Sequence, residues 1–180
     1  FRVVLKPETQ TEAEFLAMPL AELGGKSWSQ LVAEWGSANA APSVVIEAPA
    51  DRVWAQVRDF NALPKWTPFV AESRIENGLP PDRIGCVRNF RLRDGGVIRE
   101  QLLTLSDYDY QCSYSILESP MGVENYVATL KLTPVTDGNK TFAEWWAEFD
   151  CAPGRERDLA QNIGQGVFQA AFDSLKQKVR

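Results

Sequence analysis

Residues 43–60 read SVVIEAPADRVWAQVRDF, a short strand pattern that leads at once into a helical one. The first part is rich in β-branched residues, and apolar residues then recur at helix spacing from Val53 to Phe60. Downstream, residues 70–151 carry an almost unbroken strand-and-turn pattern, and one long helical pattern at about 155–179 closes the chain. This order predicts an α+β fold in which a curved antiparallel sheet wraps around a long C-terminal helix.

The strand-rich region divides at turns made of Gly, Asp, Asn and Pro. Five or six strands are predicted, at about 70–77, 86–93, 97–105, 111–117, 125–133 and 141–151. In the last two strands, apolar residues alternate with polar ones, which is typical of a sheet with one buried face. We expect the inward set to be Tyr126, Ala128, Leu130, Leu132, Ala143, Trp145, Ala147 and Phe149.

Residues 1–41 are predicted to be an N-terminal extension, separate from a domain at 42–180. Two capping-box patterns in this extension predict short helices at 12–18 and 28–36. The second helix would carry Trp28 and Trp35 on one face, which should pack on the domain or on a second subunit. A homodimer is therefore a possible assembly.

Composition excludes several classes of function. The net charge of −5 argues against a nucleic-acid partner, since phosphate binding needs a basic surface. No apolar run is long enough for an integral membrane segment, and the first thirty residues lack the apolar stretch of a signal peptide. With three widely spaced cysteines that read as reduced packing residues, these features predict a cytoplasmic location.

The chain contains no histidine. This removes Ser-His-Asp and Cys-His nucleophilic sites and histidine-based metal sites. The cysteines form no CxxC pair, so a zinc site has no support either. We expect no metal and no cofactor, and any acid–base chemistry must use Asp, Glu, Lys, Tyr or water.

Several segments together resemble the START-like superfamily with the helix-grip fold. This group includes the birch-pollen-allergen proteins, the bacterial polyketide cyclase/dehydrase-like proteins and the plant abscisic acid receptors. The resemblance covers roughly residues 43–179, and the order and spacing of its segments carry it. Besides residues 43–60, the segments are IGCVRNFRL (84–92), REQLLTLSDYD (99–109), ESPMGVENY (118–126) and EWWAEFDCAP (144–153).

The resemblance implies a cavity between the sheet and the last helix that accepts hydrophobic or amphipathic molecules. By similarity to the abscisic acid receptors, its lining would comprise Phe69, Arg88, Phe90, Leu92, Glu100, Tyr126, Ile163, Val167 and Ala171. The receptors' ligand-carboxylate lysine falls at Thr67, and their long gating loop is here only Asp94-Gly95-Gly96. The bacterial cyclase-like branch is therefore the closer likeness.

Two further residues are candidates for ligand binding. Lys65 follows Pro64 in a loop, where it could reach a ligand carboxylate at the cavity mouth. Trp145 belongs to the inward set of its strand and could line the cavity or fill the core. Tyr126 combines an apolar ring with a hydroxyl that can orient a ligand carbonyl.

Glu100 is the sharpest candidate for chemistry, because it lies in the middle of the strand VIREQLLT. A two-residue turn at Gly95-Gly96 would pair it with Arg91 on the polar face. A three-residue turn with a bulge would instead place it beside Phe90, facing inward. On the inward face, burial would raise its pKa, and Arg88 could pair with it or hold an anionic ligand group.

The sequence therefore supports two functions. The first is binding of a small hydrophobic or amphipathic ligand, such as a lipid or a polyketide-like molecule, by a carrier or sensor. The second is a cofactor-free polyketide cyclase or dehydratase, a lyase or isomerase that uses Glu100 as base and Arg88 or Tyr126 as oxyanion donor.

Overall fold

A computed structural model describes residues 2–5 and 42–179. Its centre is an eight-stranded antiparallel sheet in the order β1-β8-β7-β6-β5-β4-β3, with β2 also paired to β8. The strands are β1 (Arg2–Leu5), β2 (Ser43–Ile46), β3 (Val70–Ile75), β4 (Val87–Leu92), β5 (Val97–Ser106), β6 (Gln111–Glu118), β7 (Val123–Val135) and β8 (Lys140–Cys151). The strands predicted within residues 70–151 are all present, with ends displaced by at most two residues.

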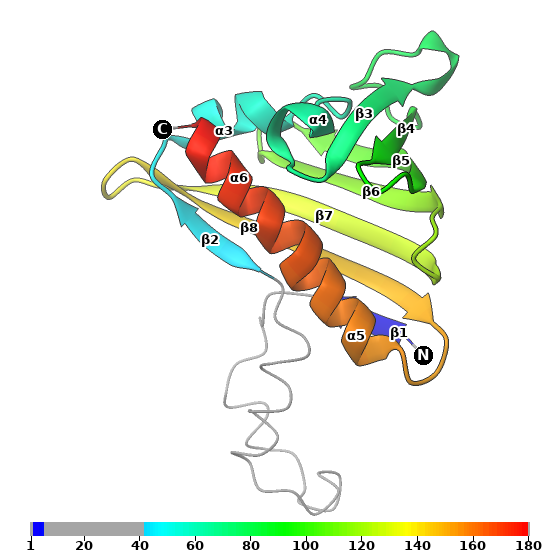
Figure 1. Cartoon of the computed structure of the whole chain (residues 1–180). Helices are drawn as coiled ribbons and strands as arrows, with labels where there is room; N and C mark the ends of the chain where they lie inside the picture. Colours follow the sequence, from blue (N-terminus) through cyan, green and yellow to red (C-terminus); the bar gives the residue numbers. More distant parts are fainter. Residues whose placement is uncertain (1, 6–41, 180) are drawn as a thin grey trace, which may run out of the picture.

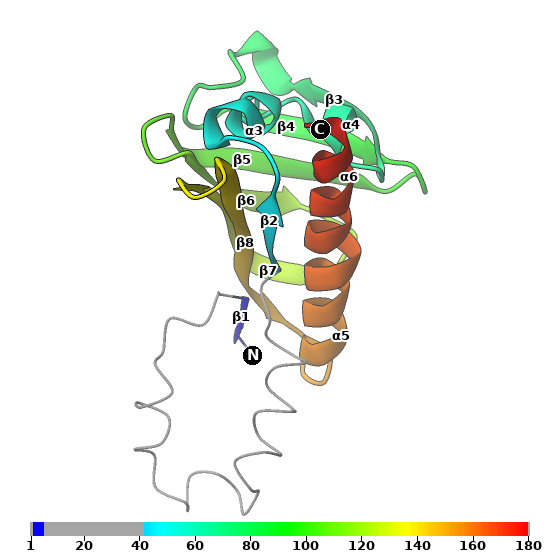
Figure 2. The same cartoon turned by 90° about the vertical axis from the view of Figure 1, so that its left-hand side faces the viewer.

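A long C-terminal helix crosses one face of this curved sheet (Figure 1). It runs from α5 (Glu156–Gln161) through the π-helical turns η3 (Asn162–Gln169) into α6 (Ala170–Lys178). Turned by 90°, the helix stands beside the sheet, and α3 (Ala50–Val57) and α4 (Leu63–Trp66) lie near its C-terminal end (Figure 2). The α+β architecture predicted from the sequence is confirmed, whereas the π-helical turns were not predicted.

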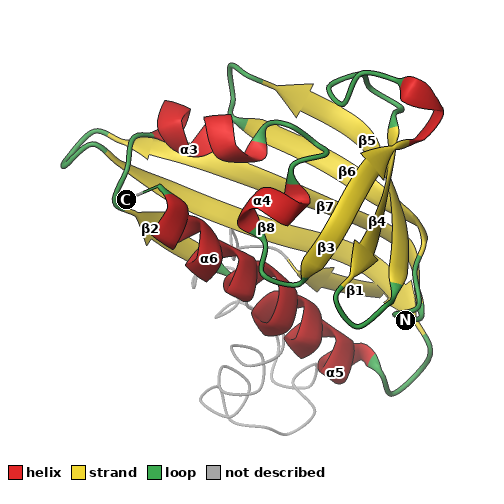
Figure 3. Ribbon diagram, turned by 45° about the horizontal axis from the view of Figure 1, so that its top comes forward, coloured by secondary structure: helices red, strands yellow, loops and turns green. Residues whose placement is uncertain are grey.

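One edge of β8 carries two strands. β1 pairs with Ala147–Asp150 and β2 with Thr141–Glu144, so the two lie along successive stretches of that edge (Figure 3). The sequence did not predict β1. The helices expected at 12–18 and 28–36 lie outside the described residues.

Aromatic packing fills the space between β8 and the C-terminal part of the long helix. The expected inward sets of β7 and β8 are buried, because alternate side chains of a strand point to the same face. Trp145 stacks on Phe168 with ring centroids 4.4 Å apart, and its ring lies 5.7 Å from Trp66 and 5.9 Å from Phe172. These aromatic rings occupy the end of the fold near α4.

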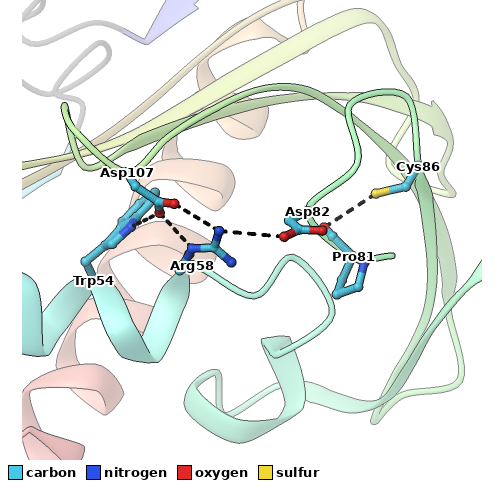
Figure 4. Close-up of polar contacts among 6 residues, drawn as sticks. All are labelled: Trp54, Arg58, Pro81, Asp82, Cys86 and Asp107. Carbon is cyan, nitrogen blue, oxygen red and sulfur yellow. Dashed lines mark hydrogen bonds and ion pairs between the residues drawn. The ribbon is translucent and has the colours of Figure 1, made fainter. Parts of the chain in front are cut away.

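A polar cluster ties α3 to two loops at the periphery (Figure 4). Trp54 donates from Nε1 to Asp107 Oδ1 at 2.7 Å, and Arg58 donates from Nε to the same oxygen at 2.7 Å. Arg58 Nη2 also lies 3.6 Å from Oδ2 of Asp82, in the loop before β4. The Arg58 and Trp54 hydrogen bonds hold the pKa of Asp107 below its usual range. The cluster anchors α3 to the β5–β6 turn.

Candidate ligand-binding cavity

A cavity of about 560 Å³ lies between the sheet and the π-helical part of the long helix. This volume is within the range usual for small-molecule sites. Strands β4 to β7, the loops β4–β5 and β6–β7, and Asn162–Phe168 supply its wall. The lining residues are Phe69, Phe90, Leu92, Arg93, Asp94, Ile98, Glu100, Tyr114, Ile116, Pro120, Met121, Tyr126, Asn162, Ile163, Gly166, Val167 and Phe168.

The β4–β5 turn determines which residues of these strands face the cavity. Gly95 donates its backbone N–H to Leu92 O at 3.0 Å, and Leu92 donates to Gly96 O at 2.8 Å. The loop therefore has three residues, Arg93–Gly95, and Gly95 adopts a positive φ of 96° that favours glycine. In this register Glu100 pairs with Arg88 and faces inward.

The three-residue β4–β5 loop decides between the two hairpin registers that the sequence left open. The two-residue turn, which would have paired Arg91 with Glu100, is wrong, because Arg91 pairs with Val97. The three-residue turn is confirmed, and so is the inward direction of Glu100, which is 5% exposed. One detail is corrected: the residue directly opposite Glu100 is Arg88, while Phe90 lies opposite Ile98.

Arg88 and Glu100 form a buried ion pair. Arg88 donates from Nε to Glu100 Oε2 at 2.6 Å, and its Nη2 lies 2.5 Å from the same oxygen. Nη1 donates to the Phe60 backbone carbonyl at 2.9 Å. The guanidinium also lies over the Phe60 ring, 3.9 Å from its centroid. Both Glu100 contacts use Oε2, so they leave Oε1 free of Arg88.

Burial dominates the electrostatics of this pair. It raises the pKa of Glu100, and the charge and hydrogen bonds of Arg88 oppose that rise. Burial also raises the pKa of Tyr126, with Glu100 adding to the effect, and that of Tyr114. Both tyrosines are therefore hydroxyl donors at neutral pH. A carboxylate and two phenols thus border an otherwise mainly apolar cavity.

Most of the predicted ligand-binding residues line this cavity. They are Phe69, Phe90, Leu92, Glu100, Tyr126, Ile163 and Val167. That these residues bind a ligand stays a prediction. Of the residues proposed for catalysis, Glu100 and Tyr126 reach the cavity. Arg88 does not line it, which corrects the expectation from the resemblance, and borders a separate void of about 10 Å³.

Lys65 and Ala171 do not belong to the lining, which corrects the expectation for both. Trp145 does not line it either, so of its two alternatives, cavity or core, the core is confirmed. Lys65 lies exposed on α4. Trp145 is buried in the aromatic core and donates from Nε1 to Tyr114 Oη at 3.1 Å. Ala171 continues the stripe of Ile163 and Val167, but it lies in α6, which packs against α4 beyond the end of the cavity.

Sequence reasoning missed part of the wall. The additional lining residues are Arg93, Asp94, Ile98, Tyr114, Ile116, Pro120, Met121, Asn162, Gly166 and Phe168. The two-residue period could have found Ile98, which shares the face of Glu100, and Tyr114, which is inward on β6. Pro120 and Met121 lie in a turn, and no periodicity signals which turn reaches the cavity.

Within residues 2–5 and 42–179, no three His, Cys, Asp or Glu side chains gather closely enough to hold a metal ion. The same part of the chain includes no helix with the length and apolar character needed to span a membrane.

Comparisons with solved structures place this fold among known proteins. The protein XoxI from Bacillus cereus superposes with a TM-score of 0.69 at 27% identity, over 78% of this chain and 94% of that one. A Thermobifida fusca protein gives a TM-score of 0.69 at 31% identity, over 77% and 90%. Ara h 8.0201 matches at a TM-score of 0.63 over 77% and 94%, and at 19% identity it shows the fold alone.

The sequence is also similar to a curated relative. It is 30% identical to the abscisic acid receptor PYL7 of Arabidopsis thaliana over 92 residues, which are 49% of this chain and 42% of the receptor. The match therefore spans less than half of the receptor's length. Residues 37–180 match the family described as polyketide cyclase/dehydrase and lipid transport. Because this match covers well over half of the sequence, the chain belongs to that family.

Proposed function

We propose that the protein binds a small hydrophobic or amphipathic molecule in the cavity between the sheet and the long helix. The observation that carries this proposal is a hollow of about 560 Å³ whose wall is mainly apolar but includes a buried carboxylate. Such a wall supplies binding energy through apolar contact and orientation through a few polar groups. A lipid or a polyketide-like molecule fits that description.

The relatives support the same function. The family description includes lipid transport, and the curated relative is named as a receptor for abscisic acid, a small molecule. A carrier or sensor needs no reactive group, only a cavity that opens to its ligand. A cytoplasmic location, the absence of a nucleic-acid partner and assembly as a homodimer stay predictions of the sequence.

Filling the cavity tests the binding proposal. Val167 lines the cavity from the long helix, whereas Gln165 is exposed on the same helix. Val167→Phe should lower the affinity for an apolar fluorescent probe at least about tenfold, because the added ring occupies ligand space. Gln165→Phe is the matched control and should leave the affinity unchanged. Equal affinities in both variants, at unchanged thermal stability, would show that the probe binds elsewhere.

A second candidate function is proton transfer on a carbonyl substrate, as in a cyclase or dehydratase. Glu100 favours it, because a buried carboxyl with a raised pKa at a cavity wall is suited to act as a general base. Its carboxylate would take a proton from the carbon next to the carbonyl. The resulting enolate oxygen would accept a hydrogen bond from the Tyr126 hydroxyl.

Hydrogen–deuterium exchange tests this second candidate without knowledge of the natural substrate. The α-protons of 2-tetralone in D₂O should exchange faster with the protein than with buffer, as followed by proton NMR. Glu100→Gln should remove the acceleration, while Glu76→Gln, a surface control, should retain it. If the wild-type protein gives no acceleration of this carbon acid, ligand binding is the better supported function.

A further inference from the structure

The charged residues around the cavity do not suit the ligand carboxylate that the sequence suggested. Its lining includes three charged residues, Arg93, Asp94 and Glu100. Arg93 and Asp94 are adjacent and exposed in the β4–β5 loop, and Arg93 Nε already donates to the Pro68 backbone carbonyl at 2.8 Å. Their opposite charges offset each other at the mouth. In the interior, the charged group at the wall is the carboxylate of Glu100.

The two cations expected to meet a ligand carboxylate are not available for that role. Lys65 does not line the cavity. Arg88 is 5% exposed and does not line the cavity, whereas its partner Glu100 does. Its three side-chain nitrogens are engaged, with Nε and Nη2 on Glu100 and Nη1 on the Phe60 carbonyl. A ligand carboxylate would have to displace Glu100 or lie beside it, and both are costly in a buried site.

Glu100 lines the cavity and keeps one carboxylate oxygen that Arg88 does not use. The contacts with Arg88 use Oε2, so Oε1 is left to face another partner. An ionised carboxylate only accepts hydrogen bonds, so it is satisfied by a donor. Because Arg88 already neutralises the charge, a ligand cation is not required, and burying one would add its own desolvation cost.

We propose that the cavity selects an uncharged ligand whose buried end carries a hydroxyl group that donates to Glu100, and that it rejects the corresponding carboxylic acid. The ligand class is thus a hydrophobic alcohol or phenol. This inference rests on the proposed binding function, and it adds the polarity of the group that reaches Glu100.

Three probes with one ring system test the inference: 2-naphthol, naphthalene and 2-naphthoic acid. At pH 7.5 the phenol is uncharged and the acid is ionised. In isothermal titration calorimetry with the wild-type protein, the affinity for 2-naphthol should exceed that for 2-naphthoate by about tenfold or more. A hydrogen bond to a charged group has a strength of that order. Naphthalene should bind more weakly than 2-naphthol, because it lacks the donor.

Glu100→Gln should reverse this selectivity. The variant removes the negative charge and leaves Arg88 without its counter-charge, so 2-naphthoate should gain affinity and 2-naphthol should lose it. Glu76→Gln is the matched control, since Glu76 also bonds an arginine, Arg99, but does not line the cavity. Its selectivity should equal that of the wild type. The wild-type comparison decides the question even if Glu100→Gln does not fold.

The outcomes separate the two proposals. If 2-naphthoate binds the wild-type protein as tightly as 2-naphthol, the selectivity is wrong and the binding function stands. If naphthalene binds as tightly as 2-naphthol, the proposed hydrogen bond to Glu100 does not form, and the site binds through apolar contact only. If none of the three probes binds, the proposed function fails and the selectivity fails with it.

Discussion

Arg88 on β4 and Glu100 on β5 lie directly opposite each other, with Arg88 Nε 2.6 Å from Glu100 Oε2. The pair joins two parts of the molecule. On one side Arg88 holds the carbonyl of Phe60, just after α3. On the other side Glu100 forms part of the cavity wall. The same ion pair therefore joins the chain after α3 to the sheet and contributes to the polarity of the cavity wall.

Replacing Arg88 should destabilise the protein strongly. Arg88→Met leaves Glu100 buried without its partner, and removing one member of a buried pair costs about 3–5 kcal/mol. Urea unfolding at pH 7 measures this cost. The double variant Arg88→Met/Glu100→Gln should recover much of the loss, because no uncompensated charge remains.

Arg91 offers the matched control for this experiment. It lies on the same strand and pairs with Glu72, but both side chains are more than half exposed. Arg91→Met should therefore change the unfolding free energy by about 0–1 kcal/mol. An equal effect of the two single variants would contradict the distinction between the buried and the exposed pair.

Glu76 should make the stability depend on pH in the acid range. Its hydrogen bond with Arg99, and then that with Asn89, lower its pKa from 4.5 to about 2. A lowered pKa means that the ionised form stabilises the folded protein. This contribution is complete above pH 4.5 and is lost as the pH falls towards 2. The difference between wild type and Glu76→Gln in urea unfolding should shrink over that range. A difference that does not vary with pH would contradict the assignment.

The β4–β5 hairpin illustrates how far sequence reasoning could go. The strands and their approximate ends followed from periodicity and from the turn residues, and the structure bears them out. Two registers remained open, since Asp94-Gly95-Gly96 suits either a two-residue or a three-residue loop. The choice depends on the backbone hydrogen bonds of Leu92, which no local pattern specifies. The direction of Glu100 was thus predicted only as one of two alternatives.

The long helix shows a different limit. The resemblance implied that Ile163, Val167 and Ala171, which recur every four residues in one stripe of the helix, line the cavity, and the first two do. Ala171 lies on the same stripe two turns after Ile163, yet it packs in the core. Periodicity gives the face of a helix but not the position along its axis where a cavity ends. That position depends on how α4 and the aromatic rings around Trp145 fill the fold.

Trp145 should behave as a core residue. It is 3% exposed and packs on three aromatic rings, so Trp145→Ala should cost about 3–5 kcal/mol of unfolding free energy. Trp145→Phe keeps an aromatic ring there and should leave probe affinity within a few-fold of the wild type. Calorimetric titration of 2-naphthol checks this. A loss of affinity as large as that of Val167→Phe would place Trp145 in contact with the ligand.

Gly166 and Asn162 lie four residues apart in the π-helical segment that borders the cavity. A Cβ atom added at Gly166 would lie 2.8 Å from Asn162 Oδ1, and both residues line the cavity. Alanine is favoured over glycine in a helix interior by about 1 kcal/mol, so the clash opposes a gain in stability. Gly166→Ala alone should therefore gain less than that amount, because the Asn162 side chain must move.

The double variant isolates the contact. Once Asn162→Ala removes the opposing oxygen, adding Gly166→Ala should recover the full gain of about 1 kcal/mol, which thermal and urea unfolding can resolve. If Gly166→Ala raises the unfolding free energy by the same amount in the wild type and in the Asn162→Ala variant, the clash with Asn162 has no effect on stability. If the two substitutions change the unfolding free energy additively, glycine at position 166 is not needed to accommodate the Asn162 side chain in the cavity wall.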